Sequence, residues 1–95
     1  MWLLKTKDMK GRERKILANG YNARVLAEGL VAMGLPVSAV RVETYRDAET
    51  SRLWCLDPHN GRRMWVGSEE DLLFKGYTEV FYDDEASGVE ISSDA

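Results

Sequence analysis

The chain has 95 residues, of which 44% are hydrophobic and 31% are charged, a composition that fits one globular domain and excludes a collagen-like or low-complexity protein. Its single cysteine, Cys55, excludes an internal disulfide and fits a reducing cytoplasm. Residues 1–46 hold nine Lys/Arg against four Asp/Glu, and residues 47–95 hold four against twelve. This asymmetry indicates electrostatic steering of a partner and does not determine a fold.

The N-terminal residues 1–6 are predicted to form a short strand with Trp2 and Leu4 on one face. The apolar run at the start is too short for a signal peptide or a membrane span, so we expect a soluble, cytoplasmic protein. Residues 7–15 are too polar to bury and are predicted to be a loop or a solvated extension of the next helix.

The main helix is predicted over residues 21–33, where apolar residues recur at i, i+4 and i+7. Either Asn19 or Asn22 can cap its start, and Gly34 ends it because glycine accepts the left-handed cap conformation. The predicted buried stripe is Leu26, Leu30 and Met33.

An alternating pattern over residues 37–46 predicts a strand; either this strand or the N-terminal strand could be an exposed edge and pair two copies into a homodimer. Residues 51–57 and 62–67 follow as a hairpin closed by Pro58-His59-Asn60-Gly61, since these residue types favour a tight turn. A four-residue loop places Trp54 opposite Trp65. We expect the other face of the hairpin, with Leu53, Cys55, Met64 and Val66, to lie under the main helix.

Ser68 begins a capping-box pattern that predicts a short helix ended by Gly76, before a last strand over residues 77–82. The predicted fold is α+β, a small antiparallel sheet in β-α-β-β-β-α-β order with one main helix on a face and a short second helix. Residues 1–82 form the single domain, and residues 83–95 are predicted to be an acidic, disordered tail.

The hairpin face that carries the two tryptophans is the first candidate site. Arg52, Trp54, Arg63 and Trp65 combine the residue types that dominate protein interfaces, and aromatic and arginine side chains also stack on bases. The competing interpretation is a second small core in which arginine stems cover the indole rings.

Two charged segments are the other candidates. The basic segment could grip phosphates, and the acidic segment could imitate a phosphate backbone, although each could equally be ordinary solvated surface. The basic residues are Lys5, Lys7, Lys10, Arg12, Arg14 and Lys15. The acidic partner-binding residues are Glu69, Glu70, Asp71, Asp83, Asp84 and Glu85.

Metal and catalytic sites are not predicted. Cys55 and His59 are too few for a structural zinc site, and no pattern marks an activated thiolate, a phosphate loop or a nucleophile elbow. We therefore expect no cofactor and no enzyme activity, and we expect Cys55 to be a buried, inert core residue.

The sequence therefore predicts a non-enzymatic binding protein that occupies a surface, expected to be basic, of a larger protein partner. By analogy of class only, it could be a small phage or mobile-element inhibitor of a nucleic-acid-handling complex, such as an anti-CRISPR protein. The alternative is a nucleic-acid-binding accessory protein that uses the basic segment and the Trp/Arg face.

Overall fold

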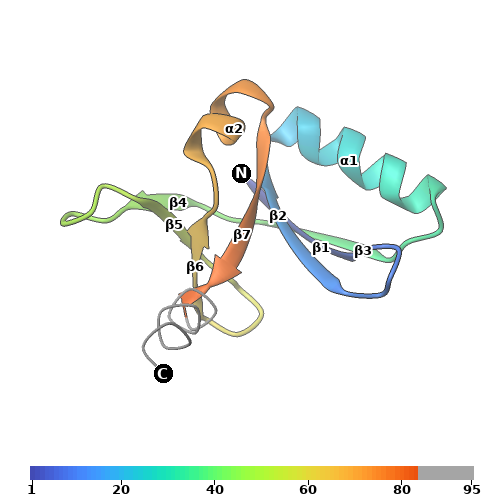
Figure 1. The fold of residues 1–95 in the computed structure, drawn as a ribbon, viewed down its shortest axis with the longest axis horizontal. Helices are drawn as coiled ribbons and strands as arrows, with labels where there is room; N and C mark the ends of the chain where they lie inside the picture. Colours follow the sequence, from blue (N-terminus) through green and yellow to red (C-terminus); the bar gives the residue numbers. More distant parts are fainter. Residues whose placement is uncertain (84–95) are drawn as a thin grey trace.

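In this computed structural model of the 95-residue chain, the described structure comprises residues 1–83 (Figure 1). All strand pairs within it are antiparallel. The elements are β1 (Trp2–Lys7), β2 (Glu13–Ala18), α1 (Gly20–Ala32), β3 (Val37–Arg41), β4 (Thr44–Arg46), β5 (Leu53–Leu56), β6 (Arg63–Val66), α2 (Glu69–Phe74) and β7 (Tyr77–Tyr82).

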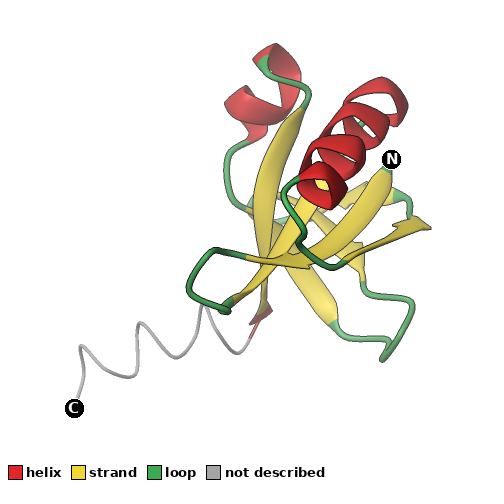
Figure 2. Ribbon diagram, turned by 90° about the vertical axis from the view of Figure 1, so that its right-hand side faces the viewer, coloured by secondary structure: helices red, strands yellow, loops and turns green. Residues whose placement is uncertain are grey.

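The sheet curls until one bent segment bridges its two ends. Its strand order is β3-β1-β2-β7-β6-β5-β4, so β3 and β4 stand at opposite ends although only two residues separate them in the chain. Val42 donates its N–H to Met1, whereas Asp47, five residues later, donates to Arg52. Within residues 37–47, β3 therefore pairs with β1 and β4 pairs with β5, so the two pairings use different parts of one segment. The result resembles a small barrel with α1 packed outside it (Figure 2).

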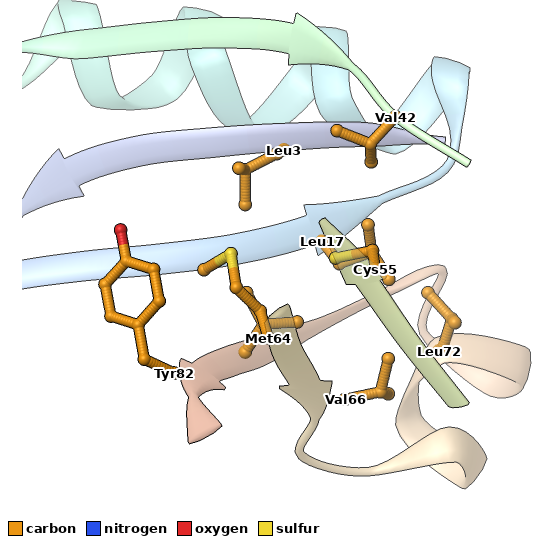
Figure 3. Packing of buried hydrophobic residues seen from close by; sticks show 9 residues of the cluster. Leu3, Leu17, Val42, Cys55, Met64, Val66, Leu72 and Tyr82 are labelled. Atoms are coloured by element: carbon orange, nitrogen blue, oxygen red, sulfur yellow. The ribbon is translucent and has the colours of Figure 1, made fainter. Parts of the chain in front are cut away.

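The curled sheet has an apolar interior and a second apolar layer outside, under α1. Leu3, Leu17 and Met64 are fully buried inside, where side chains from β1, β2, β5, β6 and β7 point toward one another (Figure 3). The adjacent residues Leu4 and Ile16 point the other way and pack with Ala23 of α1. Both faces of β1 and β2 are therefore buried.

The predicted antiparallel sheet with one main helix and a short second helix is confirmed in outline, with two changes. First, residues 13–18 form β2, so the predicted loop over residues 7–15 is confirmed for the turn at residues 8–12 and was wrong for residues 13–15. The charged half of β2 fits a strand because Arg14 pairs with Glu79 and the Lys15 side chain lies over the Tyr82 ring. Second, the predicted strand 37–46 is interrupted between β3 and β4, where the chain bends around the end of the sheet.

The bounds of α1 agree with the prediction to within one residue, and its buried face agrees in part. Asn19 is the N-cap and accepts a hydrogen bond from the N–H of Asn22 at 3.0 Å, and Gly34 follows the helix with a φ of 78°. Leu26 of the expected stripe packs against the sheet together with Ala23 and Ala27, whereas Met33 is 59% exposed. The small alanines set which stripe faces the sheet.

The prediction that α1 covers the apolar face of the 53–66 hairpin was also wrong. Cys55 and Met64 face the inside of the curled sheet, whereas α1 lies outside it over β1 and β2. The inner face of the hairpin is covered by the opposite wall of the sheet and by Leu72 of α2. A flat sheet needs a helix to bury this face, but a curled sheet buries it against itself.

The short helix and the last strand form as predicted. Ser68 caps α2 by accepting the N–H of Asp71 at 3.1 Å, and its own N–H donates to Thr78 Oγ1 at 3.0 Å. Gly76 ends the helix with a φ of 82°, and β7 runs over residues 77–82 as expected. The predicted tail is not tested, since residues 84–95 lie outside the described structure. None of the helices within residues 1–83 has the length and apolar character that crossing a bilayer requires.

Candidate functional site: the aromatic–arginine face

The three β-hairpin turns share one design, and two of them position the candidate site. Each turn begins with an aspartate whose N–H donates to the carbonyl of a closing arginine, and the residue before that arginine has a positive φ. The two later turns have loops of equal length that start ten residues apart. These turns fix the pairing register of β4 with β5 and of β5 with β6. The pairs are Asp8–Arg12, Asp47–Arg52 and Asp57–Arg62.

This register aligns four aromatic side chains across four strands on the outside of the sheet. Tyr45 opposes Trp54, Trp54 opposes Trp65, and Trp65 opposes Phe81. The Tyr45 and Trp54 rings have centroids 4.7 Å apart with planes inclined by 30°. The predicted pairing of Trp54 with Trp65 is therefore confirmed.

Two arginines complete this surface by lying over the indole rings. The guanidinium of Arg52 is 4.6 Å from the Trp65 ring centroid, and that of Arg63 is 4.7 Å from Trp65 and 5.4 Å from Trp54. Cation–π attraction at such distances contributes about 0.5–2 kcal/mol each. We call this surface the aromatic–arginine face; its residues are Tyr45, Arg52, Trp54, Leu56, Arg63, Trp65 and Phe81.

The two tryptophans differ in exposure. Trp65 is only 8% exposed, because the arginines lie over its ring and its Nε1–H donates to Asp83 Oδ1 at 2.5 Å. Trp54 is half-buried, and beside it Tyr45 and Leu56 are each 43% exposed. The interpretation as a small arginine-covered core thus describes Trp65, while Trp54, Tyr45 and Leu56 form the accessible part.

Sequence reasoning missed Tyr45 and Phe81 as members of this face. A signal for Tyr45 was present, since Asp47 and Arg52 repeat the spacing of Asp57 and Arg62 and fix the β4–β5 register in the same way. No comparable signal existed for Phe81. Its strand reaches this position by pairing with β6 only after α2 has returned the chain to the sheet.

The predicted acidic residues do not form one surface with this face. Asp83 joins it, opposite Arg63 with 3.6 Å between Nη2 and Oδ2. Glu69, Glu70 and Asp71 lie on α2 at the other end of β7, roughly 20 Å away for a six-residue strand. Hydrogen bonds from Arg46 lower the pKa of Glu69 and so keep it charged. Asp84 and Glu85 lie outside the described residues.

The predicted basic segment is also divided rather than gathered into one patch. It forms the β1–β2 hairpin, whose side chains alternate between the two faces of the sheet. Arg12 pairs with Asp8 at 2.8 Å and Arg14 with Glu79 at 2.5 Å, while Lys15 lies 4.8 Å from the ring centroid of Tyr82. Lys7 and Lys10 remain exposed on the hairpin.

The remaining basic residue, Lys5, belongs to a buried polar cluster at the end of the curled sheet opposite α2. The fully buried Asp57 accepts from Lys5 Nζ at 2.6 Å, from the Tyr82 hydroxyl at 2.6 Å and from the backbone N–H of His59 at 2.9 Å. Burial alone would raise the pKa of Asp57, but these donors outweigh it and hold that pKa well below its usual value. All of this geometry fits a structural carboxylate that closes the end of the sheet.

Cys55 is buried, as predicted. Its side chain is fully enclosed, and burial, followed by the nearby Asp57 charge, raises the pKa of the thiol to about 11. At neutral pH the thiolate that nucleophilic catalysis requires is therefore scarce. Within residues 1–83 no three His, Cys, Asp or Glu side chains are arranged to hold a metal ion.

Comparison of the chain with protein families, curated proteins and solved structures found no match in any of the three.

Proposed function

We propose that the protein is a non-enzymatic binding protein that occupies a surface of a larger protein partner through the aromatic–arginine face. The observation behind the proposal is the unequal exposure of the aromatic side chains on this face. Trp54, Tyr45 and Leu56 are accessible next to a nearly closed Trp65. Binding can bury these residues without refolding the sheet, because cross-strand register and cation–π contacts already fix the rings.

The charges of this face favour recognition of a protein over passive burial. Arg52 forms no ion pair within residues 1–83, and its guanidinium sits on the Trp65 ring with its edge available to acceptors. Arg63 lies over both Trp54 and Trp65, and its Nη2 is 3.6 Å from Asp83 Oδ2. A partner that offers a carbonyl or carboxylate beside an apolar contact would match this arrangement.

The alternative, a nucleic-acid-binding accessory protein, shares the same rings but gains little from the predicted basic segment. Arg12 and Arg14 are neutralised by Asp8 and Glu79, and Lys5 is bound to Asp57. A single-stranded ligand would therefore depend on the aromatic–arginine face alone, with few additional phosphate contacts.

A site-specific crosslinking experiment tests the proposal. A photoreactive residue replaces Leu56 on the aromatic–arginine face or, as the control, Val31, which is 60% exposed on α1. Native host lysate supplies the partner. We expect one crosslinked protein from position 56, lost when Tyr45→Ser and Arg52→Glu are added, and unaffected by Tyr21→Ser on α1. Equal products from positions 56 and 31 would refute the proposed face.

Nucleic-acid binding is measured in parallel with a fluorescent single-stranded oligonucleotide. Nucleic-acid binding is indicated by micromolar affinity that weakens steeply between about 50 and 200 mM salt and is lost with Arg52→Glu. This result would favour the nucleic-acid-binding accessory protein over a protein that binds a protein partner. The narrower inhibitor prediction has its own test, in which the crosslinked partner is identified and its nuclease or nucleic-acid-binding activity is assayed with and without the protein.

A further inference from the structure

The short helix α2 exposes its apolar end to solvent. Leu72 alone is buried against the interior of the sheet, while Leu73 and Phe74 are 76% and 77% exposed. Successive residues of a helix point about 100° apart, so three consecutive apolar side chains cannot all face one wall. Burial of a Leu or Phe side chain is favourable, and neither Leu73 nor Phe74 is buried in this structure.

These side chains border a hollow whose lining is apolar except for Glu69 and Glu70, which we call its acidic rim. Its volume is about 450 Å³, and β5 and the start of the chain complete its wall. We call this region the α2 surface; it is lined by Met1, Leu53, Glu69, Glu70, Leu72, Leu73 and Phe74.

The rim retains negative charge. Glu69 is paired with Arg46 at 2.6 Å, and Asp71 lies 3.8 Å from Lys75. Glu70 forms no ion pair with any residue in the described part of the chain, yet it lines the hollow beside Leu73. A ligand that fits this surface must therefore combine apolar side chains with positive charge.

We propose that the α2 surface docks a basic amphipathic helix of a partner protein. A helix presents apolar side chains at i, i+3, i+4 and i+7 with cationic side chains beside them, which matches an apolar hollow with an acidic rim. An added strand would need an open sheet edge, but Leu53 lies in β5, which is paired on both sides.

This second surface is independent of the proposed function. Asp83, which contacts the aromatic–arginine face through Trp65, lies at one end of β7, and α2 precedes the other end. The two surfaces share no residue, so this proposal does not rest on the aromatic–arginine face.

The probe is a labelled synthetic 18-residue peptide of Leu and Lys, with Leu at helical i, i+3, i+4 and i+7 spacing, followed by fluorescence anisotropy. A peptide of the same composition, with Leu and Lys rearranged so that no apolar face forms, reports charge attraction alone. We expect micromolar binding of the patterned peptide and about tenfold weaker binding of the rearranged one, a difference of about 1.4 kcal/mol.

Three variants locate the binding. Leu73→Ser with Phe74→Ser, both at exposed positions, should weaken patterned-peptide binding about tenfold, and Glu70→Lys should weaken it several-fold. Met9→Ser, at a residue 76% exposed in the β1–β2 turn, is the matched control and should leave binding unchanged. Arg52→Glu should also leave it unchanged, which separates this test from that of the aromatic–arginine face.

Three results would overturn the proposal. One is the absence of patterned-peptide binding at about 100 μM. Another is equal binding by the Leu73→Ser/Phe74→Ser variant and the parent protein. The third is a dimer in sedimentation that this variant dissociates, because it would assign the α2 surface to a second copy of the chain.

Discussion

Replacing Asp57 with Asn tests the claim that a buried carboxylate closes one end of the curled sheet. The substitution preserves shape and retains an oxygen for the His59 N–H, but it removes the charge that faces Lys5 Nζ at 2.6 Å. It also places an amide where the Tyr82 hydroxyl now donates at 2.6 Å. The variant therefore separates the electrostatic role of Asp57 from its role in the turn.

The expected loss of stability is large for a substitution that leaves the size of the side chain unchanged. Removing one partner of a buried ion pair costs roughly 3–5 kcal/mol, because the remaining charge is left without compensation. Lys5 retains 21% exposure of its side chain and can reach water, so the lower end, about 3 kcal/mol, applies. For a domain of this size such a loss lowers Tm by roughly 10–20 °C.

Urea unfolding, followed by tryptophan fluorescence at pH 7, measures this loss. Asp47→Asn is the matched control: it begins the equivalent turn, where Asp47 accepts from Thr50 but from no buried lysine, and it should cost less than about 1 kcal/mol. A double-mutant cycle with Lys5→Met should give a coupling of about 1 kcal/mol or more. An Asp57→Asn cost below about 1 kcal/mol would refute the reasoning.

The pH dependence gives a second, independent check. The pKa of Asp57 is lowered in the folded state, so its contribution to stability is fully present above the unfolded pKa of about 3.9, begins to decline below that pH and is lost as pH falls through the folded pKa. The difference between the parent protein and Asp57→Asn should therefore be constant from about pH 5 to 8 and shrink below about pH 4. An unchanged difference at pH 3 would assign the effect to packing.

Three further predictions concern local features. Gly76→Ala should lower the free energy of unfolding by more than about 1 kcal/mol, because Gly76 has a φ of 82° and a Cβ there would clash with the Asn22 side chain. Gly29→Ala should raise the free energy of unfolding by about 1 kcal/mol, because a Cβ on this α1 residue would extend into open space. Chemical denaturation measures both, and the same sign for the two would contradict this reading. Ser68→Ala should cost about 1 kcal/mol by removing the cap of α2, seen as a lower denaturation midpoint, and no change would mean that the cap is dispensable. Cys55 should resist a thiol reagent at pH 7 until the protein is unfolded in urea, and rapid labelling of the native protein would contradict its burial and raised pKa.

Short-range chemistry in the sequence determined the caps, the turns and the Trp54–Trp65 register. Asn19, Ser68 and Gly76 act within a few residues of themselves, so their roles follow from side-chain and backbone preferences alone. The turn that starts at Asp57 likewise sets its own hairpin, because a loop of fixed length admits one register.

Tertiary structure decided which faces are buried and what gathers on the surface. Ile16 and Leu17 are both buried, one under α1 and one inside the sheet, so β2 lacks the alternation that identifies a strand with one exposed face. Curling of the sheet buries the hairpin against its opposite wall and moves α1 to the outside. It also adds Phe81 to the tryptophan row and separates the acids of α2 from Asp83. These outcomes depend on pairings between distant segments, and those pairings are settled by the fold as a whole.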